Sequence, residues 1–344
     1  MLTTVVVGLR STVSLAGALS QARALATELP DRQNTSRTEG EAESHEWWVE
    51  HAELLEAARV EYGPKHTSLY DFAAHVESFI QPELLAAIRG CERAASEGEL
   101  VDESAVLKLL SPAGPQNVWR MPLFTEHFCK LLLDEYRHYE ASGIPLRRPN
   151  GMNRYGAILD HLGMAPSLDY LSRRFLRPLG QMLYPWLVGE GDADEHYAFM
   201  VRYAPGEDVD LAEHADASVL TLNANLGVAG FEGGAIAFRG TRFIDDEPQE
   251  VPPSRVDFAD FSPGDAIVHL GQTYHAALPT TAGVRANLIV WLHGKHEVVR
   301  ISAHDEHDQL TAQQRWAAFG VEAARAHMEG LFQSTSSRHN KDEP

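Results

Sequence analysis

The fold is decided by residues 196–226, HYAFMVRYAPGEDVDLAEHADASVLTLNANL, together with residues 263–292, PGDAIVHLGQTYHAALPTTAGVRANLIVWL. Apolar and polar residues alternate there with a period of two, which indicates strands with one buried face. The runs are short and are separated by turn residues such as Pro205-Gly206 and Pro263-Gly264. This pattern predicts several short strands arranged as a sandwich or a barrel.

Two runs alternate between an apolar set of side chains and a second set that carries the polar ones. In residues 219–226 Leu220, Leu222, Ala224 and Leu226 alternate with Thr221, Asn223 and Asn225. In residues 285–292 Ala286, Leu288, Val290 and Leu292 alternate with Arg285, Asn287, Ile289 and Trp291. Because neighbouring side chains of a strand point to opposite faces, the polar set of a two-sheet roll can line a cavity.

The polar face carries a pattern of metal ligands. Only one residue separates His214 from Asp216, so in an extended chain both side chains lie on the same face. His275 follows after a gap long enough for several strands. Two imidazoles and one carboxylate that leave open positions on a metal are typical of non-haem Fe(II) oxygenases.

An arginine, Arg285, follows His275 at the start of the next predicted strand. A guanidinium cannot lose its proton in water and can bind a carboxylate with two hydrogen bonds. His269 competes with His275 as the third ligand, but the residue equivalent to the arginine would then be Pro279, so we prefer His275 and treat His269 as a core or neighbouring residue. Zinc can use the same ligands, although zinc hydrolysis does not need that arginine.

Helices are expected upstream of the strands, at residues 46–95, at 124–139 and at 168–183, with a short one at 103–110. Gly63-Pro64 divides the first region. Thr125 is suited to cap the second helix at its start and Gly143 at its end. Pro178 is expected to kink or divide the third.

Composition narrows the class of protein. The chain has 344 residues and a formal net charge of −20, which disfavours binding to nucleic acid or to anionic membranes. Its 2 cysteines are too few for a disulfide framework, which favours a reducing compartment. No apolar run approaches a membrane span, so an intracellular, soluble protein is expected. Residues 1–27 lack acidic residues and resemble either a mitochondrial or plastid transit peptide or an ordinary leading strand and helix.

These features together resemble a known family. The matching motifs are Arg202-Tyr203-Ala204-Pro205-Gly206, the His214/Asp216 pair, Phe231-Glu232-Gly233-Gly234, Gly264-Asp265, His275 and Arg285 to Trp291. They are similar to motifs of the 2-oxoglutarate- and Fe(II)-dependent dioxygenases of the prolyl 4-hydroxylase-like superfamily. Arg148-Pro149-Asn150, Met152-Asn153 and Tyr155-Gly156 extend the resemblance to the group of 2-oxoglutarate and iron-dependent oxygenase domain-containing protein 2.

The resemblance implies an α+β fold, with a double-stranded β-helix (jelly-roll) core, supporting helices and a helical N-terminal region. It implies that His214, Asp216 and His275 bind Fe(II), and that Arg285 pairs with the distal carboxylate of the co-substrate 2-oxoglutarate. O₂ is the second co-substrate, and L-ascorbate is expected to maintain the iron, as in related enzymes.

Further residues are candidates for ligand contact. Tyr203 matches a family tyrosine that lines the co-substrate pocket. Thr221 and Asn223 face the same cavity by strand alternation and are candidate co-substrate contacts. Asn153 and Tyr155 lie in a turn-rich loop that is a candidate substrate loop.

The expected organisation has four segments: an N-terminal segment and linker at 1–45, a helical accessory region at 46–120, a dioxygenase domain at 121–300 with its β-roll at 196–295, and a polar tail with a possible helix at 301–344. The expected activity is hydroxylation of an amino-acid side chain, prolyl-hydroxylase-like, with decarboxylation of 2-oxoglutarate to succinate and CO₂. The substrate, protein or small molecule, stays open. The alternatives are a non-catalytic β-roll binding or scaffold protein and a zinc-dependent hydrolase.

Overall fold

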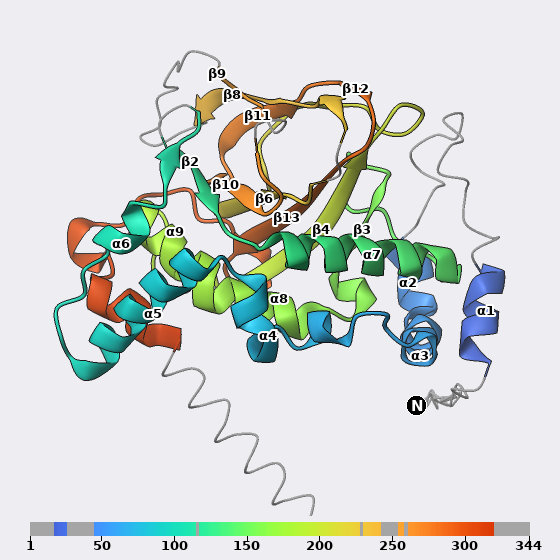
Figure 1. Ribbon diagram of the computed structural model, residues 1–344, viewed down its shortest axis with the longest axis horizontal. Helices are drawn as coiled ribbons and strands as arrows, with labels where there is room; N and C mark the ends of the chain where they lie inside the picture. The colour runs from blue at the N-terminus through green and yellow to red at the C-terminus, as the bar shows by residue number, and fades with distance from the viewer. Residues whose placement is uncertain are drawn as a thin grey trace, which may run out of the picture.

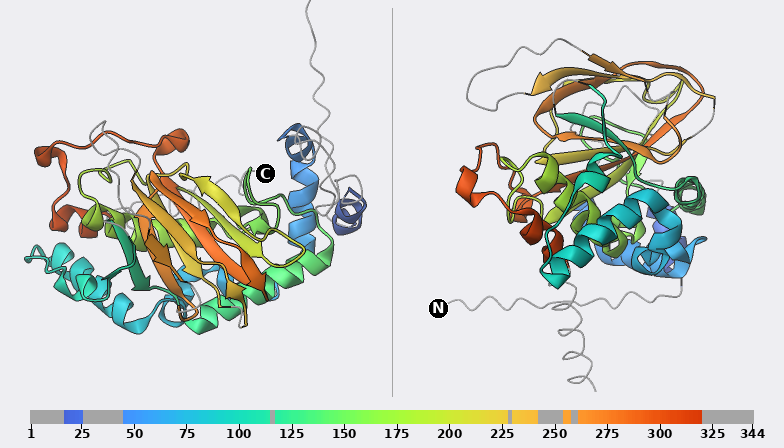
Figure 2. Two further views of the ribbon diagram at one scale, coloured as in Figure 1. Left: turned by 90° about the horizontal axis from the view of Figure 1, so that it is seen from above. Right: turned by 60° about the vertical axis from the view of Figure 1, so that its left-hand side comes forward.

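The computed structural model describes residues 17–25, 45–114, 117–227, 230–241, 254–257 and 261–319. Most of the possible transit peptide, the linker before residue 45 and the end of the predicted C-terminal helix lie outside these ranges. The described chain combines antiparallel sheets with helices, as the predicted α+β class requires. Figure 1 shows two sheets facing each other above a layer of helices, and the right-hand view of Figure 2 shows the same layering.

The larger sheet has seven strands in the order β1-β2-β10-β6-β13-β4-β3. Their bounds are β1 Ser111–Pro112, β2 Val118–Pro122, β10 Asp265–Leu270, β6 Leu220–Asn225, β13 Arg285–His293, β4 Glu195–Tyr203 and β3 Gly156–Ile158. The smaller sheet, β5-β11-β8-β9, consists of Leu211–His214, Thr273–Ala277, Ile236–Thr241 and Ser254–Val256. A pair, β12 Thr280–Ala282 and β7 Glu232–Gly233, completes the strands of the described residues.

The helices precede or interrupt the strands. They are α1 Ala18–Leu25, α2 His45–Glu50, α3 Ala52–Tyr62, α4 Phe72–Phe79, α5 Pro82–Glu97, α6 Ser104–Leu107, α7 Glu126–Ser142, α8 Ala165–Leu171 and α9 Arg177–Leu183. Residues 312–319 are also helical, and Trp316 from this segment is buried in the main core.

The predicted alternation of the central strands is confirmed. Leu222 of β6 and Leu288 of β13 are buried in the same core cluster as Phe128 of α7, so this face of the larger sheet packs on the helices. Thr221 and Ile289 line a cavity on the opposite face, toward the smaller sheet. One face of the larger sheet thus makes the core, and the other is available for a site.

The helix ends follow their local signals. The Thr125 side chain accepts a hydrogen bond from the backbone N–H of Phe128, and Gly143 is left-handed with φ 77°, as expected for caps of α7. The kink expected at Pro178 takes the form of a π-helical turn, Ser172–Leu176, just before α9. Because proline donates no N–H, the wider turn accommodates it without ending the helical run.

A buried glutamate, which the sequence patterns did not reveal, ties the N-terminal helices to α7. The Glu135 carboxylate is fully buried and accepts hydrogen bonds from the hydroxyls of Tyr62 and Tyr70, at 3.1 and 3.2 Å. It also accepts from the backbone N–H of Lys65, at 3.2 Å, and of His66, at 2.7 Å. Four donors from residues 62–70 thus compensate the cost of burying this charge.

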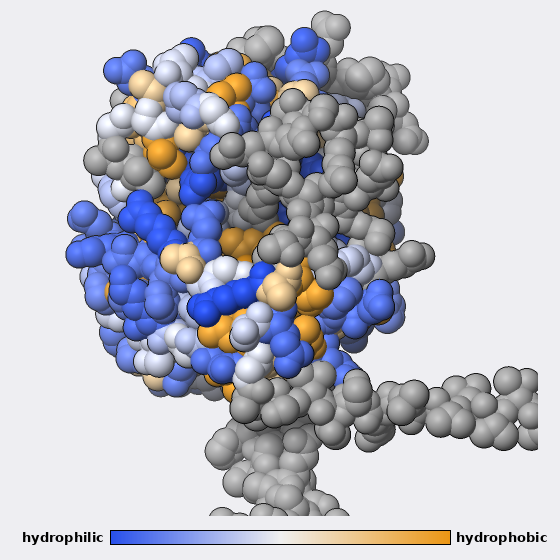
Figure 3. All heavy atoms as spheres, turned by 90° about the vertical axis from the view of Figure 1, so that its right-hand side faces the viewer, coloured by the Kyte–Doolittle hydropathy of each residue, from blue (hydrophilic) through white to orange (hydrophobic). Residues whose placement is uncertain are grey.

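The side of the molecule seen in Figure 3 is largely hydrophilic over the sheets, and hydrophobic residues gather in its lower, helical half. Val49 of α2 and Val60 of α3 are exposed hydrophobic residues of this helical layer. Within the described ranges, none of the helices combines the length and the apolar character needed to cross a bilayer.

Candidate metal centre

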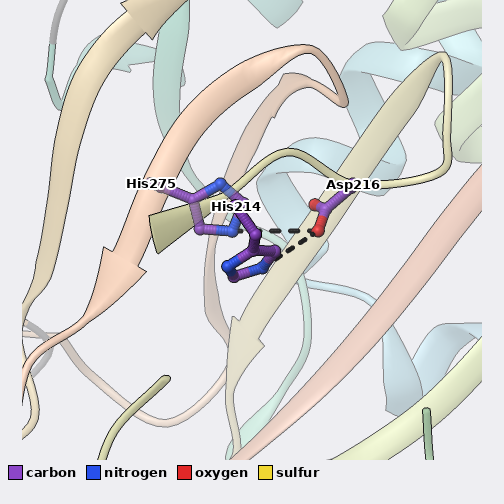
Figure 4. Close-up of side chains that lie close together, drawn as sticks. All are labelled: His214, Asp216 and His275. Atoms are coloured by element: carbon purple, nitrogen blue, oxygen red, sulfur yellow. Dashed lines mark ion pairs between the residues drawn. The ribbon is translucent and has the colours of Figure 1, made fainter. Parts of the chain in front are cut away.

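The three predicted ligands come together at one point between the sheets. His214 ends β5, His275 lies in β11, and the two residues are direct partners in the antiparallel pair. Asp216 Oδ1 lies 3.4 Å from His214 Nε2 and 3.8 Å from His275 Nε2 (Figure 4). One ligand atom from each residue lies within 4.8 Å of the others. Neighbouring ligands of an ion about 2.1 Å from each lie about 3 Å apart, so the arrangement fits a single cation.

Backbone carbonyls fix which nitrogen of each histidine faces the carboxylate. His214 Nδ1 lies 2.8 Å from the Ala212 carbonyl and His275 Nδ1 lies 2.9 Å from the Thr273 carbonyl. A carbonyl only accepts, so both Nδ1 atoms carry the hydrogen. Both Nε2 lone pairs are then directed to the centre, as second-sphere hydrogen bonds do in metal sites.

Asp216 is oriented by a short hydroxyl chain. The Thr221 hydroxyl donates to Asp216 Oδ2 at 2.6 Å, and Ser218 Oγ lies 2.8 Å from Thr221 Oγ1. Because the Thr221 hydrogen goes to the carboxylate, Ser218 must donate to Thr221. The Thr221 hydroxyl occupies Oδ2 of Asp216 and leaves Oδ1 facing the histidines. This favours one metal bond from Asp216, through Oδ1. Thr221 therefore points into the cavity as predicted, and its hydroxyl is hydrogen-bonded to Asp216.

His269, the rival third ligand, lies beside the centre on the other oxygen of Asp216. Its Nε2 is 4.0 Å from Oδ2, and its Nδ1 lies 2.9 Å from the Leu270 carbonyl. The side chain is fully buried, and its Nε2 has no hydrogen-bond partner among the described residues. Burial lowers the pKa of His269 to about 4. His269 therefore lies beside the three ligands, but its ring nitrogens are not among the atoms that can share one ion.

The protonation states suit a cation. Burial alone raises the pKa of Asp216, but the nearby His275 and the hydrogen bonds from His214 and Thr221 outweigh it and hold this pKa well below its ordinary value. Burial lowers the pKa of His275. Despite burial, Asp216 raises the pKa of His214. The centre therefore favours an ionised carboxylate, and a bound cation would compete with a proton for His214 Nε2.

The centre opens into a cavity with about 440 Å³ of empty space, counting the part that reaches solvent. His214, Asp216, His275 and Arg285 all line it. Its apolar walls are formed by Phe199, Val201, Leu211, Ile236, Ala277, Ile289 and Trp291, and of these Leu211, Ile236 and Ala277 gave no sequence signal.

The predicted arginine lines the same cavity. Arg285 is 1% exposed, and burial lowers its pKa to about 10, so it stays charged at neutral pH. Its guanidinium carbon lies 5.2 Å from the centre of the Tyr203 ring, on the neighbouring strand. Its Nε donates to Asn287 Oδ1 at 2.9 Å, and Asn287 Nδ2 donates to Asn223 Oδ1 at 2.7 Å. Tyr203, expected here from the resemblance, and Asn223, expected here from strand alternation, thus share the cavity with Arg285.

The loop before β3 closes one side of the cavity. Asn153 is buried, lines the cavity and donates through Nδ2 to the Tyr203 hydroxyl at 3.0 Å. Asn150, which the sequence patterns did not single out, also lines the cavity and donates to Asn153 Oδ1 at 3.0 Å. Tyr155 is not a lining residue: its backbone N–H donates to the buried Asp208 carboxylate, which anchors the loop.

The sequence of this chain is similar to that of known proteins. A family model described as "OGFOD2-like domain" matches residues 59–189. The human "2-oxoglutarate and iron-dependent oxygenase domain-containing protein 2" is 38% identical over 238 residues, which are 67% of this chain and 63% of that protein. An Arabidopsis thaliana relative, "2-oxoglutarate and iron-dependent oxygenase domain-containing protein ICU11", is 38% identical over 51% of this chain and 44% of its own length.

More distant similarity reaches "Procollagen-lysine,2-oxoglutarate 5-dioxygenase 1" of Rattus norvegicus, 30% identical over 52% of this chain and 24% of that protein. A solved prolyl-4-hydroxylase of Pseudomonas putida aligns with a TM-score of 0.37 at 16% identity, over 63% of this chain and 98% of the other, which is too low to decide the fold. The chain spans somewhat less than two thirds of the length of its human relative. From the sequence matches, this chain is similar to the group of 2-oxoglutarate and iron-dependent oxygenase domain-containing protein 2, and its residues 59–189 match the OGFOD2-like domain.

Proposed function

We propose that the chain is a 2-oxoglutarate- and Fe(II)-dependent dioxygenase that hydroxylates an amino-acid side chain and converts 2-oxoglutarate to succinate and CO₂. The observation that carries this proposal is one cavity that is lined by two groups of side chains. His214, Asp216 and His275 have ligand atoms within 4.8 Å of one another, and the buried Arg285 lines the same cavity. A zinc hydrolase would use the three ligands and have no need for the arginine.

In this proposal His214, Asp216 and His275 hold Fe(II), which supplies the redox chemistry that couples decarboxylation of 2-oxoglutarate to activation of O₂. Arg285 binds the distal carboxylate of 2-oxoglutarate, with the Tyr203 hydroxyl beside it. The apolar walls exclude water and leave room for an uncharged part of the substrate. L-Ascorbate is proposed as the reductant that keeps the iron in its ferrous state.

The proposal includes the finer architecture. The two facing antiparallel sheets, with seven and four strands, support a double-stranded β-helix core. Residues 121–300 are proposed as the dioxygenase domain and residues 46–120 as an accessory region that docks on it through Glu135. For the substrate, a prolyl or lysyl side chain is consistent with the names of the distant relatives.

The test is succinate formation by protein loaded with Fe(II) under anaerobic conditions and then supplied with O₂ and 2-oxoglutarate. The wild-type protein is expected to form succinate. His275→Ala is expected to form it at least about 100-fold more slowly, because one of the three metal ligands is missing. His307→Ala, at an exposed histidine, is the matched control and should match wild type. Equal rates in His275→Ala and wild type would remove His275 from the ligand set.

A further inference from the structure

Asn287 is a fully buried amide that does not itself line the cavity. It is 0% exposed and joins two side chains that line the cavity. On one side it accepts from Arg285 Nε at 2.9 Å, and on the other it donates to Asn223 Oδ1 at 2.7 Å. A buried amide so engaged has little freedom to turn.

The direction of each hydrogen bond follows from the chemistry of the arginine. A guanidinium has donors only, so the amide atom that it touches must be the oxygen of Asn287. The nitrogen of Asn287 then faces Asn223, and the atom of Asn223 that receives its hydrogen must also be an oxygen. The remaining atom of the Asn223 amide is its NH₂ group, and Asn223 lines the cavity. The hydrogen-bond relay formed by Arg285, Asn287 and Asn223 therefore has donor groups at both of its ends, the guanidinium of Arg285 and the NH₂ group of Asn223.

We propose that Asn287 is a positioning residue that holds the Arg285 guanidinium and the Asn223 amide so that both donate into the cavity. Through them it makes the cavity prefer a keto acid that carries a distal carboxylate over one that ends in an uncharged group. This inference rests on the proposed function, because it concerns the binding of 2-oxoglutarate.

A neutral amide suits this role better than a carboxylate. An aspartate at this position would hold Arg285 equally well, but its charge would cancel that of the guanidinium. The Asn287 oxygen fixes the side chain and leaves its charge available to attract an anion.

A second relay sets the polarity of Tyr203 in the same way. Backbone N–H groups of Met152 and Asn153 donate to Asn150 Oδ1, so the nitrogen of Asn150 must donate to Asn153 Oδ1. Asn153 Nδ2 then donates to the Tyr203 oxygen. The phenol hydrogen is therefore directed away from Asn153, and the Tyr203 hydroxyl can also act as a donor.

The test compares two ligands on protein loaded with Mn(II), which occupies the site without turnover. Calorimetry measures the Kd of 2-oxoglutarate and of 2-oxopentanoate, which has the same keto-acid end but no distal carboxylate. Wild type is expected to prefer 2-oxoglutarate. In Asn287→Leu the affinity for 2-oxoglutarate should fall about 10- to 100-fold, the effect of losing one well-placed hydrogen bond to a charged group. The Kd of 2-oxopentanoate and of Mn(II) should change by less than about 3-fold.

Asn225→Leu is the matched control. Asn225 is a buried amide of β6 that bonds the Phe261 carbonyl and the Gly227 N–H and does not line the cavity. It should keep the wild-type preference. An unchanged preference in Asn287→Leu, or an equal loss in Asn225→Leu, would overturn the role of Asn287. If Asn287→Leu does not fold, Asn287→Ser, which is too short to bridge both partners, takes its place.

The two proposals fail in different ways. A wild type that does not prefer 2-oxoglutarate overturns the proposed function and this inference with it. A wild type with the preference, together with an Asn287→Leu variant that keeps it, overturns only the positioning role.

Discussion

Replacing Thr221 by valine tests whether the hydroxyl chain holds the metal-facing carboxylate in place. Valine has nearly the shape of threonine, so the change removes the 2.6 Å hydrogen bond to Asp216 and the acceptor of the Ser218 hydroxyl but leaves the packing almost unchanged. Thr221 is 1% exposed, so water does not readily replace the hydroxyl. Without this bond the carboxylate can rotate, and Oδ1 is no longer held toward His214 and His275.

The size of the effect follows from the kind of bond that is lost. A hydrogen bond from a buried hydroxyl to a carboxylate contributes about 1.5 to 3 kcal/mol, and loss of a second-sphere partner typically weakens metal binding about 10- to 100-fold. We therefore expect the Kd of Mn(II) to rise about 10- to 100-fold in Thr221→Val, measured by calorimetry at fixed pH. Thr221→Ser keeps the hydroxyl and should stay within about 3-fold of wild type.

The affinities of Thr221→Val for Mn(II) and for 2-oxoglutarate also show whether Thr221 orients Asp216 or contacts the co-substrate. If Thr221→Val folds, as judged by its thermal unfolding, and binds Mn(II) as tightly as wild type, the orienting role is wrong. A selective loss of affinity for 2-oxoglutarate with unchanged metal binding would instead make Thr221 a direct co-substrate contact.

Three further predictions address the arginine, the core and the pH dependence. Gly234→Ala should raise the Kd of 2-oxoglutarate at least about 10-fold, because a Cβ there would lie 2.9 Å from Arg285 Cδ and displace the guanidinium. Glu135→Gln should lower the free energy of unfolding in urea by about 2 to 4 kcal/mol, since an amide cannot accept from all of the donors around it. Burial, with the charges of two arginines, lowers the pKa of His161 to about 4. Between that pH and its ordinary pKa of about 6.5 the unfolded chain binds the proton and the folded chain does not, so stability falls on acidification, and His161→Gln should flatten this slope.

Each of these predictions has a contrary outcome. Gly230→Ala shares the positive φ, +84°, but its Cβ would meet nothing within 4 Å, so equal losses in both glycine variants would contradict the steric argument. Glu97→Gln, at an exposed site, should cost less than about 0.5 kcal/mol, and a similar cost for Glu135→Gln would show that the buried carboxylate is dispensable. An unchanged pH slope in His161→Gln would exclude His161 as its source.

Some features of this protein are determined by residues close together in the chain. The period of two in residues 219–226 decided which side chains of β6 face the helices and which face the cavity, because alternation is a property of the extended backbone itself. Thr125 and Gly143 marked the ends of α7 for a similar reason, since caps satisfy backbone groups within one turn. The one-residue spacing of His214 and Asp216, together with the resemblance, was enough to predict a metal site.

Tertiary structure alone decided how these pieces meet. Only strand pairing places His275 opposite His214, and only packing brings Thr221 to Asp216 and Asn287 between Arg285 and Asn223. In the sequence, Glu135 is indistinguishable from any other charged residue of an amphipathic helix. Its burial is seen only in the structure, where the loop after α3 covers it. The physical reason is that hydrogen-bond partners and burial depend on contacts between residues far apart in the chain, which local periodicity does not encode.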